Sequence, residues 1–260
     1  MIRALVNGSW KAFENDQLQP GTNNFGFEGG LYETFRTMDH QPIFLVQHLD
    51  RLFESAESMG LKPHFQRYEI ETMIDQVIKE FPDPEQRARI LLVPGKIIIY
   101  TTPLDLDHNI YSGVSVISIP AQRKDPHIKT TNHSVCLNAY EIAQDNNCFD
   151  AILIDEDDQV FEGSRSNVFW VKNNDLYTRE KDVLPGITRQ MIIMNSPHPV
   201  NYSKLKLLDL GGADEVFLTN SGSGIIPVVK VNNTQIGVGN PGPITMNLLD
   251  LYPTWMNNES

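Results

Sequence analysis

Cysteine is scarce in this chain. Its 260 residues include only Cys136 and Cys148, which lack the C-x-x-C spacing of a redox or zinc-binding motif. The sequence therefore offers neither a disulfide framework nor a cysteine zinc site, and we expect no metal. Both thiols are expected to be small apolar side chains buried in the fold.

Long apolar runs are also absent. No stretch approaches the ~20 apolar residues that cross a bilayer, and the first residues lack the basic and apolar segments of a secretory signal. Positive charge is limited too, since 21 Lys and Arg face 33 Asp and Glu, for a net charge of −12. An acidic surface disfavours a nucleic acid or an anionic membrane as partner. We therefore expect a cytoplasmic protein that acts on a small molecule.

The motifs of several common enzyme classes are missing. The sequence has no GxGxxG after a strand, no GxxxxGK[ST], no HExxH and no GxSxG between a strand and a helix. The sequence therefore lacks the motifs that dinucleotide-binding, P-loop, zincin and α/β-hydrolase sites require. The seven histidines are scattered, and nothing favours a Ser-His-Asp triad.

The apolar pattern of the first half predicts a mixture of helices and strands. Its clearest element is a helix over residues 47–60, where apolar side chains recur every three or four positions. Arg51 lies off this stripe, which by itself indicates a solvated side chain. Asn7-Gly8 predicts a hairpin turn. An N-terminal domain over residues 1–117 would also contain a helix over residues 68–80 and strands over residues 2–6, 29–37, 42–46, 87–93, 96–101 and 114–117.

Residues 118–126 indicate a connector, and residues 127–260 a second mixed domain. Glu162 ends a predicted strand at a sharp bend, where an isolated glutamate is ordinarily exposed. The helix after Gly186 and the loop over residues 220–224 both present backbone amides that suit a phosphate. The predicted helices cover residues 134–144 and 243–251, and residues 184–189 lead into a third that ends at residue 194. The predicted strands cover residues 150–155, 160–162, 167–171, 215–219 and 225–229.

Lys129 is the candidate nucleophile. It follows the connector directly, so its amine would lie at the mouth between the two halves of the chain. Small ligands bind in such clefts, and a desolvated amine can attack a carbonyl carbon. Outside a cleft, the same lysine would be an ordinary solvated cation.

Six motifs, taken together and in order, resemble those of the class IV (fold-type IV) pyridoxal-phosphate enzymes. This family contains branched-chain aminotransferases, D-amino-acid aminotransferases and 4-amino-4-deoxychorismate lyases. The motifs span nearly the whole chain: Leu31-Tyr-Glu-Thr-Phe-Arg36, His48-Leu-Asp-Arg-Leu52, Lys129-Thr-Thr-Asn132, Glu162-Gly-Ser-Arg-Ser-Asn-Val-Phe169, Leu184-Pro-Gly-Ile-Thr-Arg189, and Ala213-Asp-Glu-Val-Phe-Leu-Thr219 with Pro227-Val-Val229.

The resemblance implies an α/β fold of two domains, the N-terminal one smaller, with pyridoxal 5'-phosphate between them and a second copy completing a homodimer. It implies that Lys129 binds the cofactor covalently and later moves the substrate proton, and that Glu162 keeps the pyridine nitrogen protonated. Tyr32 and Glu33 would line the substrate side. The phosphate would be bound by Arg51, Ile187, Thr188, Asn220, Ser221 and Gly222.

The resemblance does not decide between the reactions that are found in this family. The Arg-x-His pair of D-amino-acid aminotransferases is absent, and Pro94 replaces an arginine common in lyases and some transaminases. The substrate carboxylate therefore needs another cation, for which Arg89, Lys96 and Arg165 are candidates. Glu33 and the Glu162-Gly-Ser stretch are similar to transaminases, whereas Asn220 is similar to lyases.

We expect an aminotransferase that uses an amino acid and a 2-oxo acid. A branched-chain or other apolar amino acid is favoured, because Tyr32, Phe35 and Ile225-Ile226 could form an apolar wall. The first alternative is a 4-amino-4-deoxychorismate lyase that releases pyruvate and p-aminobenzoate. The second alternative is a ligand-binding protein of this fold without catalysis.

Overall fold

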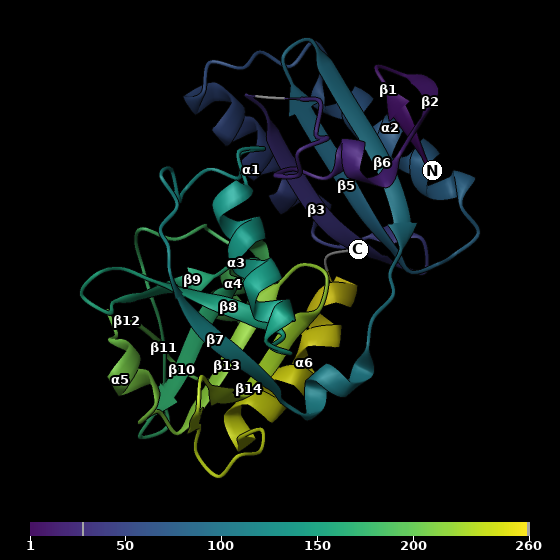
Figure 1. Ribbon diagram of the computed structural model, residues 1–260. Helices are drawn as coiled ribbons and strands as arrows, with labels where there is room; N and C mark the ends of the chain where they lie inside the picture. The colour runs from purple at the N-terminus through teal and green to yellow at the C-terminus, as the bar shows by residue number, and fades with distance from the viewer. Residues whose placement is uncertain (28, 259–260) are drawn as a thin grey trace. The chain divides into compact units, whose positions relative to one another are not determined.

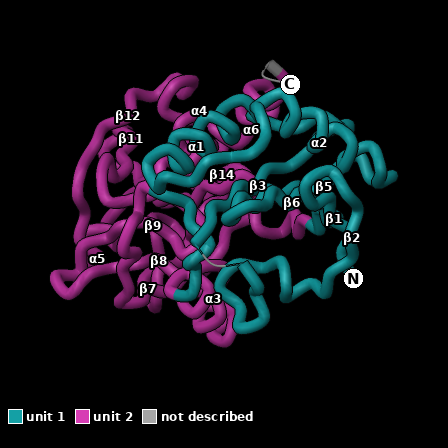
Figure 2. The backbone as a smooth tube through the Cα atoms, turned by 90° about the horizontal axis from the view of Figure 1, so that it is seen from above, with its two compact units in different colours: residues 1–105, 128–134, 259–260 teal, residues 106–127, 135–258 magenta. Residues whose placement is uncertain are grey.

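The computed structural model describes residues 1–27 and 29–258, which form two compact units (Figure 2). Unit 1 contains Met1–Asp105 and Ile128–Ser134, and unit 2 contains Leu106–His127 and Val135–Asn258. The chain thus leaves unit 1 after Asp105 and returns to it briefly with the segment that carries Lys129.

Unit 1 is built on an antiparallel sheet with the strand order β2-β1-β6-β5-β3-β4 (Figure 1). The predicted Asn-Gly turn is confirmed: Asn7 and Gly8 have φ of 48° and 78°, so both adopt the left-handed conformation that a tight hairpin requires. The elements are β1 Ile2–Val6, β2 Ser9–Phe13, η1 Asn15–Leu18, β3 Leu31–Met38, β4 Gln41–Pro42, α1 Leu45–Ser58, α2 Arg67–Glu80, β5 Gln86–Val93 and β6 Lys96–Pro103.

The two faces of this sheet bury different sets of side chains, because successive residues of a strand point to opposite sides. On one face, Phe35 of β3 and Ile90 of β5 pack with α1 and α2 in a large apolar core. On the other face, Tyr32 of β3 and Leu91 of β5 pack with Leu18 in a smaller cluster. The alternation along β3 therefore separates Tyr32 from Glu33 by the thickness of the sheet.

Unit 2 is built on a mixed sheet with the order β12-β11-β10-β13-β14-β7-β8-β9, and β15 pairs with β14. Helix α3 packs through Ala139 and Ala143 on β8, in a cluster with Leu153. The elements are η2 His108–Ser112, β7 Val114–Pro120, α3 Ser134–Asp145, β8 Asp150–Ile154, β9 Val160–Gly163, β10 Asn167–Lys172, β11 Asp175–Thr178, α4 Ile187–Asn195, β12 Val200–Tyr202, α5 Leu207–Leu210, β13 Glu215–Asn220, β14 Gly224–Val231, β15 Thr234–Gln235 and α6 Pro243–Asn258.

The domain boundary expected at residue 117 differs from this division. The strand predicted over residues 114–117 exists, but β7 pairs in parallel with β8 and β14 and so belongs to the sheet of unit 2. It also extends to Pro120, into the expected connector. Both strand partners lie downstream in the sequence, so the local pattern could not assign β7 to its sheet.

The strand predicted over residues 42–46 is wrong. Strand β4 ends at Pro42, and α1 already begins at Leu45. Phe44 has φ of 55°, and this left-handed residue turns the extended chain into the helix. Its ring is buried at 3% exposure, and we infer that this burial offsets the cost of the conformation.

Three expectations from composition can be compared with the described residues. Within them, no helix is long and apolar enough to cross a membrane. The same part of the chain contains no group of His, Cys, Asp or Glu side chains that could hold a metal ion. Cys136 is buried, as expected, whereas Cys148 is only half-buried.

Candidate active site

The segment around Lys129 is paired with the first residues of β3. The Tyr32 amide donates to the Lys129 carbonyl at 3.0 Å, and the Thr131 amide donates to the Gly30 carbonyl at 2.8 Å. The Gly30 amide in turn donates to Thr131 Oγ1 at 3.1 Å. Gly30 also packs closely against β5, since a Cβ there would lie 2.6 Å from the Leu92 carbonyl oxygen. These hydrogen bonds attach the backbone of Lys129 to β3.

The Lys129 side chain lies against Tyr32. Its Nζ is 4.5 Å from the centroid of the Tyr32 ring, which is itself 6% exposed. The Tyr32 hydroxyl lies 3.2 Å from Nδ1 of His133, four positions after Lys129 in the chain. The half-buried amine thus has an aromatic face beneath it, a contact that favours a cation.

Glu33, His48 and Arg51 form a buried polar cluster beside the core of unit 1. Arg51 donates from Nε to Glu33 Oε1 and from Nη2 to Oε2, both at 2.7 Å, and His48 Nδ1 lies 2.7 Å from Oε2. Their exposures are 1% for Glu33, 0% for His48 and 7% for Arg51. Arg51 is therefore not the solvated side chain that its position off the apolar stripe alone would indicate. The Glu33 carboxylate, which the resemblance placed on the substrate side, bonds to Arg51 and His48.

The charges of this cluster follow from its burial and its contacts. Burial by itself raises the pKa of Glu33, but the Arg51 charge and the contacts with His48 outweigh it and lower the pKa to about 2. Burial lowers the pKa of His48, and the charges of Arg51 and Lys129 act in the same direction against the contact with Glu33. His48 is therefore neutral at pH 7. Because a carboxylate only accepts, the imidazole donates its Nδ1 proton to Glu33.

Arg89 lies near Tyr32 on β5 and is half-buried. Its Nε donates to Thr34 Oγ1 and its Nη1 donates to the Tyr100 hydroxyl, both at 3.2 Å. The guanidinium carbon is 5.8 Å from the Tyr32 ring centroid. Among the ion pairs of the described residues, none includes Arg89. The other two cation candidates, Lys96 and Arg165, are exposed.

In unit 2, Glu162 lies near the end of β9, just before the bend over residues 164–166, and is only 4% exposed. It is therefore not the exposed turn glutamate that its residue type alone would indicate. Its Oε1 accepts from Arg123 Nη1 at 3.1 Å, and its Oε2 accepts from the Leu184 amide at 2.9 Å. Arg123 was missed at the sequence level. It is one of two cations in the expected connector, and nothing local links it to Glu162.

The turn that follows Glu162 is held by a buried aspartate. Asp150, which is 0% exposed, accepts from the hydroxyls of Ser164 and Ser166, the latter at 2.7 Å. A Cβ on Gly163 would lie 2.0 Å from Ser166 Oγ, so only glycine fits this turn. The two serine hydroxyls of the Gly-Ser-x-Ser stretch thus attach the turn after Glu162 to Asp150.

Helix α4 begins at Ile187 after Gly186, which provides no side-chain cap. The first turn contains no acidic residue, so its amides retain the partial positive charge that attracts an anion. Thr188 is 2% exposed, and its Oγ1 lies 3.4 Å from the Tyr252 hydroxyl. These donors are chemically suited to a phosphate, as the resemblance implies.

The loop between β13 and β14 is organised by its first residue. Asn220 Oδ1 accepts from the amides of Gly222 and Ser223 at 3.0 and 2.7 Å. Gly224 closes the loop with φ of 74°, and a Cβ there would lie 2.8 Å from the Tyr252 ring. The Asn220 carboxamide oxygen therefore folds the loop, while Ser221 lies half-exposed within it.

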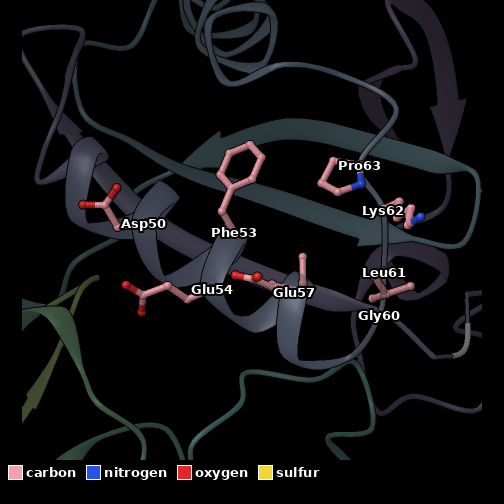
Figure 3. Close-up of a pocket in the computed structure, with 9 residues that line it drawn as sticks. Asp50, Phe53, Glu54, Glu57, Gly60, Leu61, Lys62 and Pro63 are labelled. Carbon is pink, nitrogen blue, oxygen red and sulfur yellow. The ribbon is translucent and has the colours of Figure 1, made fainter.

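A pocket of about 660 Å³ lies elsewhere in unit 1, along the exposed side of α1 (Figure 3). Phe53 contributes an apolar wall, and Asp50, Glu54 and Glu57 contribute carboxylates. None of the residues predicted for the cofactor or the substrate lines it. The volume of this pocket therefore does not identify the site of chemistry.

Comparison with known proteins agrees with the motifs. The family model of class IV aminotransferases matches residues 30–231. A probable branched-chain-amino-acid aminotransferase from Thermotoga maritima is 32% identical over 243 residues, which cover 89% of this chain and 88% of that protein. An aminodeoxychorismate lyase from Bacillus subtilis is 27% identical over 278 residues and covers 97% of this chain and 94% of its own.

Solved structures confirm the expected fold. The crystal structure of a putative branched-chain amino acid aminotransferase from Thermotoga maritima matches with a TM-score of 0.85 and 27% identity, covering 99% of this chain and 96% of that chain. Sequence motifs, family match and fold agree, and the chain belongs to the class IV aminotransferase family.

Proposed function

We propose that this protein is a pyridoxal-phosphate-dependent aminotransferase that transfers an amino group between an amino acid and a 2-oxo acid. The observation that supports the proposal most strongly is the position of the Lys129 amine. The backbone of Lys129 is fixed to β3, and its amine lies half-buried over the Tyr32 ring, so the nucleophile has a defined position. Family membership and the name of the Thermotoga maritima relative support the same reaction.

The donors and acceptors of the chain fit the chemical groups of the cofactor. Lys129 supplies the amine for its aldehyde, and Glu162 supplies a buried carboxylate for its pyridine nitrogen. Arg51 supplies a guanidinium for its phosphate, together with the α4 amides of Ile187 and Thr188. When bound, the cofactor supplies a protonated ring that withdraws electrons from the substrate α-carbon.

Each of these side chains has its own task. Glu162 would face the ring nitrogen, and Arg123 and the Leu184 amide hold its two oxygens in place. With the cofactor bound, Lys129 would serve as the base that takes up the proton of the substrate α-carbon. The Tyr32 ring covers one side of that amine and limits its contact with water.

Glu33 orients Arg51 instead of contacting the substrate. The two parallel hydrogen bonds fix the plane of the guanidinium, so that its positive charge would meet the phosphate in a defined orientation. In this role Glu33 is a positioning residue. The neutral His48 supports the other side of the same carboxylate.

For the substrate carboxylate we propose Arg89 in preference to Lys96 and Arg165. Arg89 is half-buried and donates to two neutral hydroxyls. These contacts orient the guanidinium but do not neutralise its positive charge. It also lies beside Tyr32, which contacts Lys129. The two exposed cations are instead directed at aromatic rings, Lys96 at Phe27 and Arg165 at Tyr140.

A branched-chain substrate remains part of the proposal and is supported by the name of the Thermotoga maritima relative. The apolar wall expected from the sequence needs revision, because Phe35, Ile225 and Ile226 are all 0% exposed and belong to the protein interior. Of the side chains expected in that wall, we retain only Tyr32 as a candidate for contact with the substrate, since it contacts Lys129 directly.

The deciding experiment follows the colour of the cofactor. Purified protein with pyridoxal phosphate should show a visible absorption band that borohydride removes, and Lys129→Ala should not show it. Mixing the loaded protein with single amino acids, leucine, isoleucine and valine included, and no 2-oxo acid should convert that band to the band of the amine form. A protein that stays colourless would overturn the proposal.

The same experiment separates the lyase alternative, which the Bacillus subtilis relative keeps open. A lyase would release pyruvate from 4-amino-4-deoxychorismate and leave the cofactor in its original aldehyde form. Retention of the visible band with every amino acid, together with pyruvate release, would therefore replace our proposal by the lyase reaction. Retention of the band without pyruvate release would indicate the non-catalytic alternative.

We also propose that the protein acts as a homodimer, as the resemblance to the family implies. A chain of 29.5 kDa should then sediment with about twice that mass. A monomer at micromolar concentration, with full activity in the assay above, would contradict this part of the proposal.

A further inference from the structure

His133 has no role in the site described so far, yet it is tied to it by a specific contact. Its Nδ1 lies 3.2 Å from the Tyr32 hydroxyl, and its Nε2 lies 3.4 Å from the same oxygen. The two rings meet edge to face, with centroids 5.5 Å apart and an interplanar angle of 71°. The ring of Tyr32 is packed with Leu18 and Leu91, and this contact also holds its polar end.

Tyr32 is the surface on which Lys129 lies. The Lys129 Nζ is 4.5 Å from the Tyr32 ring centroid, a distance at which a cation is attracted to the ring face. Since the Lys129 carbonyl accepts from the Tyr32 amide, the two residues are held together at their backbones as well. A change in the tilt of the Tyr32 ring therefore moves the surface beneath the amine, while the backbone stays in place.

The position of His133 is fixed by the same segment that carries Lys129. Thr131, two positions before His133, bonds to both the carbonyl and the amide of Gly30. His133 consequently approaches Tyr32 from a chain already attached to β3. Arg89 is the other charged group near this ring, and it is held by Thr34 and Tyr100.

We propose that His133 is a positioning residue, which acts through the Tyr32 hydroxyl to set the orientation and reactivity of the Lys129 amine. The inference rests on the proposed function insofar as Lys129 is the amine that binds the cofactor. The contacts that carry it belong to the protein alone. It can therefore be tested without a cofactor.

The first experiment measures the reactivity of Lys129 in the full chain after dialysis against hydroxylamine, which releases any bound aldehyde. The protein is treated with formaldehyde and cyanoborohydride, and the methylation of each lysine is followed by peptide mass spectrometry. Lys172, whose Nζ lies 3.6 Å from Asp214 in unit 2, serves as the internal reference. The quantity of interest is the ratio of the Lys129 rate to the Lys172 rate.

His133→Leu and Tyr32→Phe should each raise this ratio about two- to fivefold. Each removes the bond that holds the ring under the charged amine, and such contacts contribute on the scale of a single hydrogen bond. The double variant should give the same ratio as either single variant, because both changes remove one shared interaction. His133→Gln, which can still bond to the hydroxyl, should restore a ratio near that of the parent.

Two outcomes would overturn the inference. An unchanged ratio in His133→Leu, even with a lowered melting temperature, would leave His133 with a purely structural role. Effects of the two single substitutions that multiply in the double variant would mean that His133 does not act through Tyr32.

A second measurement separates this inference from the proposed function. Pyridoxal phosphate is added to each variant, and the rate of appearance of the borohydride-sensitive band is recorded. If the parent protein never forms the band, the proposed function fails, and the methylation ratios still decide the role of His133. If the parent forms it, we expect its rate in His133→Leu to change by the same factor as the methylation ratio, and an unaltered rate would contradict the inference.

Discussion

Glu33 and Arg51 are joined by two hydrogen bonds of 2.7 Å, one from Nε to Oε1 and one from Nη2 to Oε2. The carboxylate comes from β3 and the guanidinium from α1, so the pair links the sheet of unit 1 to its first helix. Both side chains are at least nine-tenths buried. Breaking one partner would therefore leave the other as an uncompensated charge in the interior.

The first prediction is that Glu33→Gln lowers the free energy of unfolding by about 3 kcal/mol, the scale expected when one member of a buried ion pair is removed. Urea denaturation measures this change. Asp75→Asn is the matched control, because Asp75 pairs with Lys79 on an exposed helix face, where such pairs contribute about 0.5 kcal/mol. Equal losses in the two variants would mean that the Glu33–Arg51 pair contributes no more than a surface ion pair.

The second prediction concerns pH. Glu33 has a pKa of about 2 in the folded protein against 4.5 for the free side chain, so the unfolded chain binds more protons between these values. The stability that Glu33 provides is therefore complete above about pH 4.5 and is lost as the pH falls toward 2. The shift corresponds to about 3 kcal/mol. In acid denaturation, the parent and Glu33→Gln should converge below pH 2, and a constant difference down to that pH would contradict the assignment.

The sequence predicted most of the local structure of unit 1, because that structure depends on short-range patterns. The apolar stripe identified α1 to within two residues at each end, and Asn7-Gly8 identified the first hairpin. The misassigned β7 shows where such patterns stop being informative. A strand with partners in parallel does not reveal in its own residues which sheet it joins.

The sequence names candidate site residues where the family motifs are continuous, but it does not predict which distant side chains pair. Neither the Glu33–Arg51 contact nor the Arg123–Glu162 contact leaves a periodic signal, since 17 and 38 residues separate the partners. A helical stripe can show that Arg51 is off the apolar face. It cannot show that a glutamate from β3 reaches the same place.

The third prediction concerns the cofactor phosphate. Arg51→Gln should weaken pyridoxal phosphate binding by about 2 to 3 kcal/mol, because a charge-assisted contact is replaced by a neutral one. Fluorescence titration of the hydroxylamine-treated protein measures the dissociation constant.

Arg67→Gln is the control, since Arg67 is on α2 and pairs with Asp50 and Glu71. Because Arg51→Gln also leaves Glu33 buried without its cation, the titration is made where urea denaturation shows the variant to be folded. Unchanged affinity in the folded variant would mean that Arg51 does not bind the phosphate and serves only to pair with Glu33.

The fourth prediction concerns the carboxylate of unit 2. Glu162→Gln removes the charge that faces Arg123 and places an amide group where both protein partners, Arg123 and the Leu184 amide, are donors. The variant should still bind the cofactor through its phosphate, but its single-turnover rate with an amino acid should fall about 100-fold or more, the scale of losing one oriented electrostatic contact in an active site. Stopped-flow absorbance records that rate.

The control for this prediction is Glu162→Asp, which keeps the charge and shortens the side chain by one methylene group. If the charge at the ring nitrogen governs the reaction, Glu162→Asp should react faster than Glu162→Gln, although more slowly than the parent. Equal rates for the two variants would indicate that position and not charge is decisive. A parent-like rate for Glu162→Gln with cofactor bound would remove Glu162 from the reaction, and the Arg123–Glu162 ion pair would then serve only to join the chain before α3 to β9.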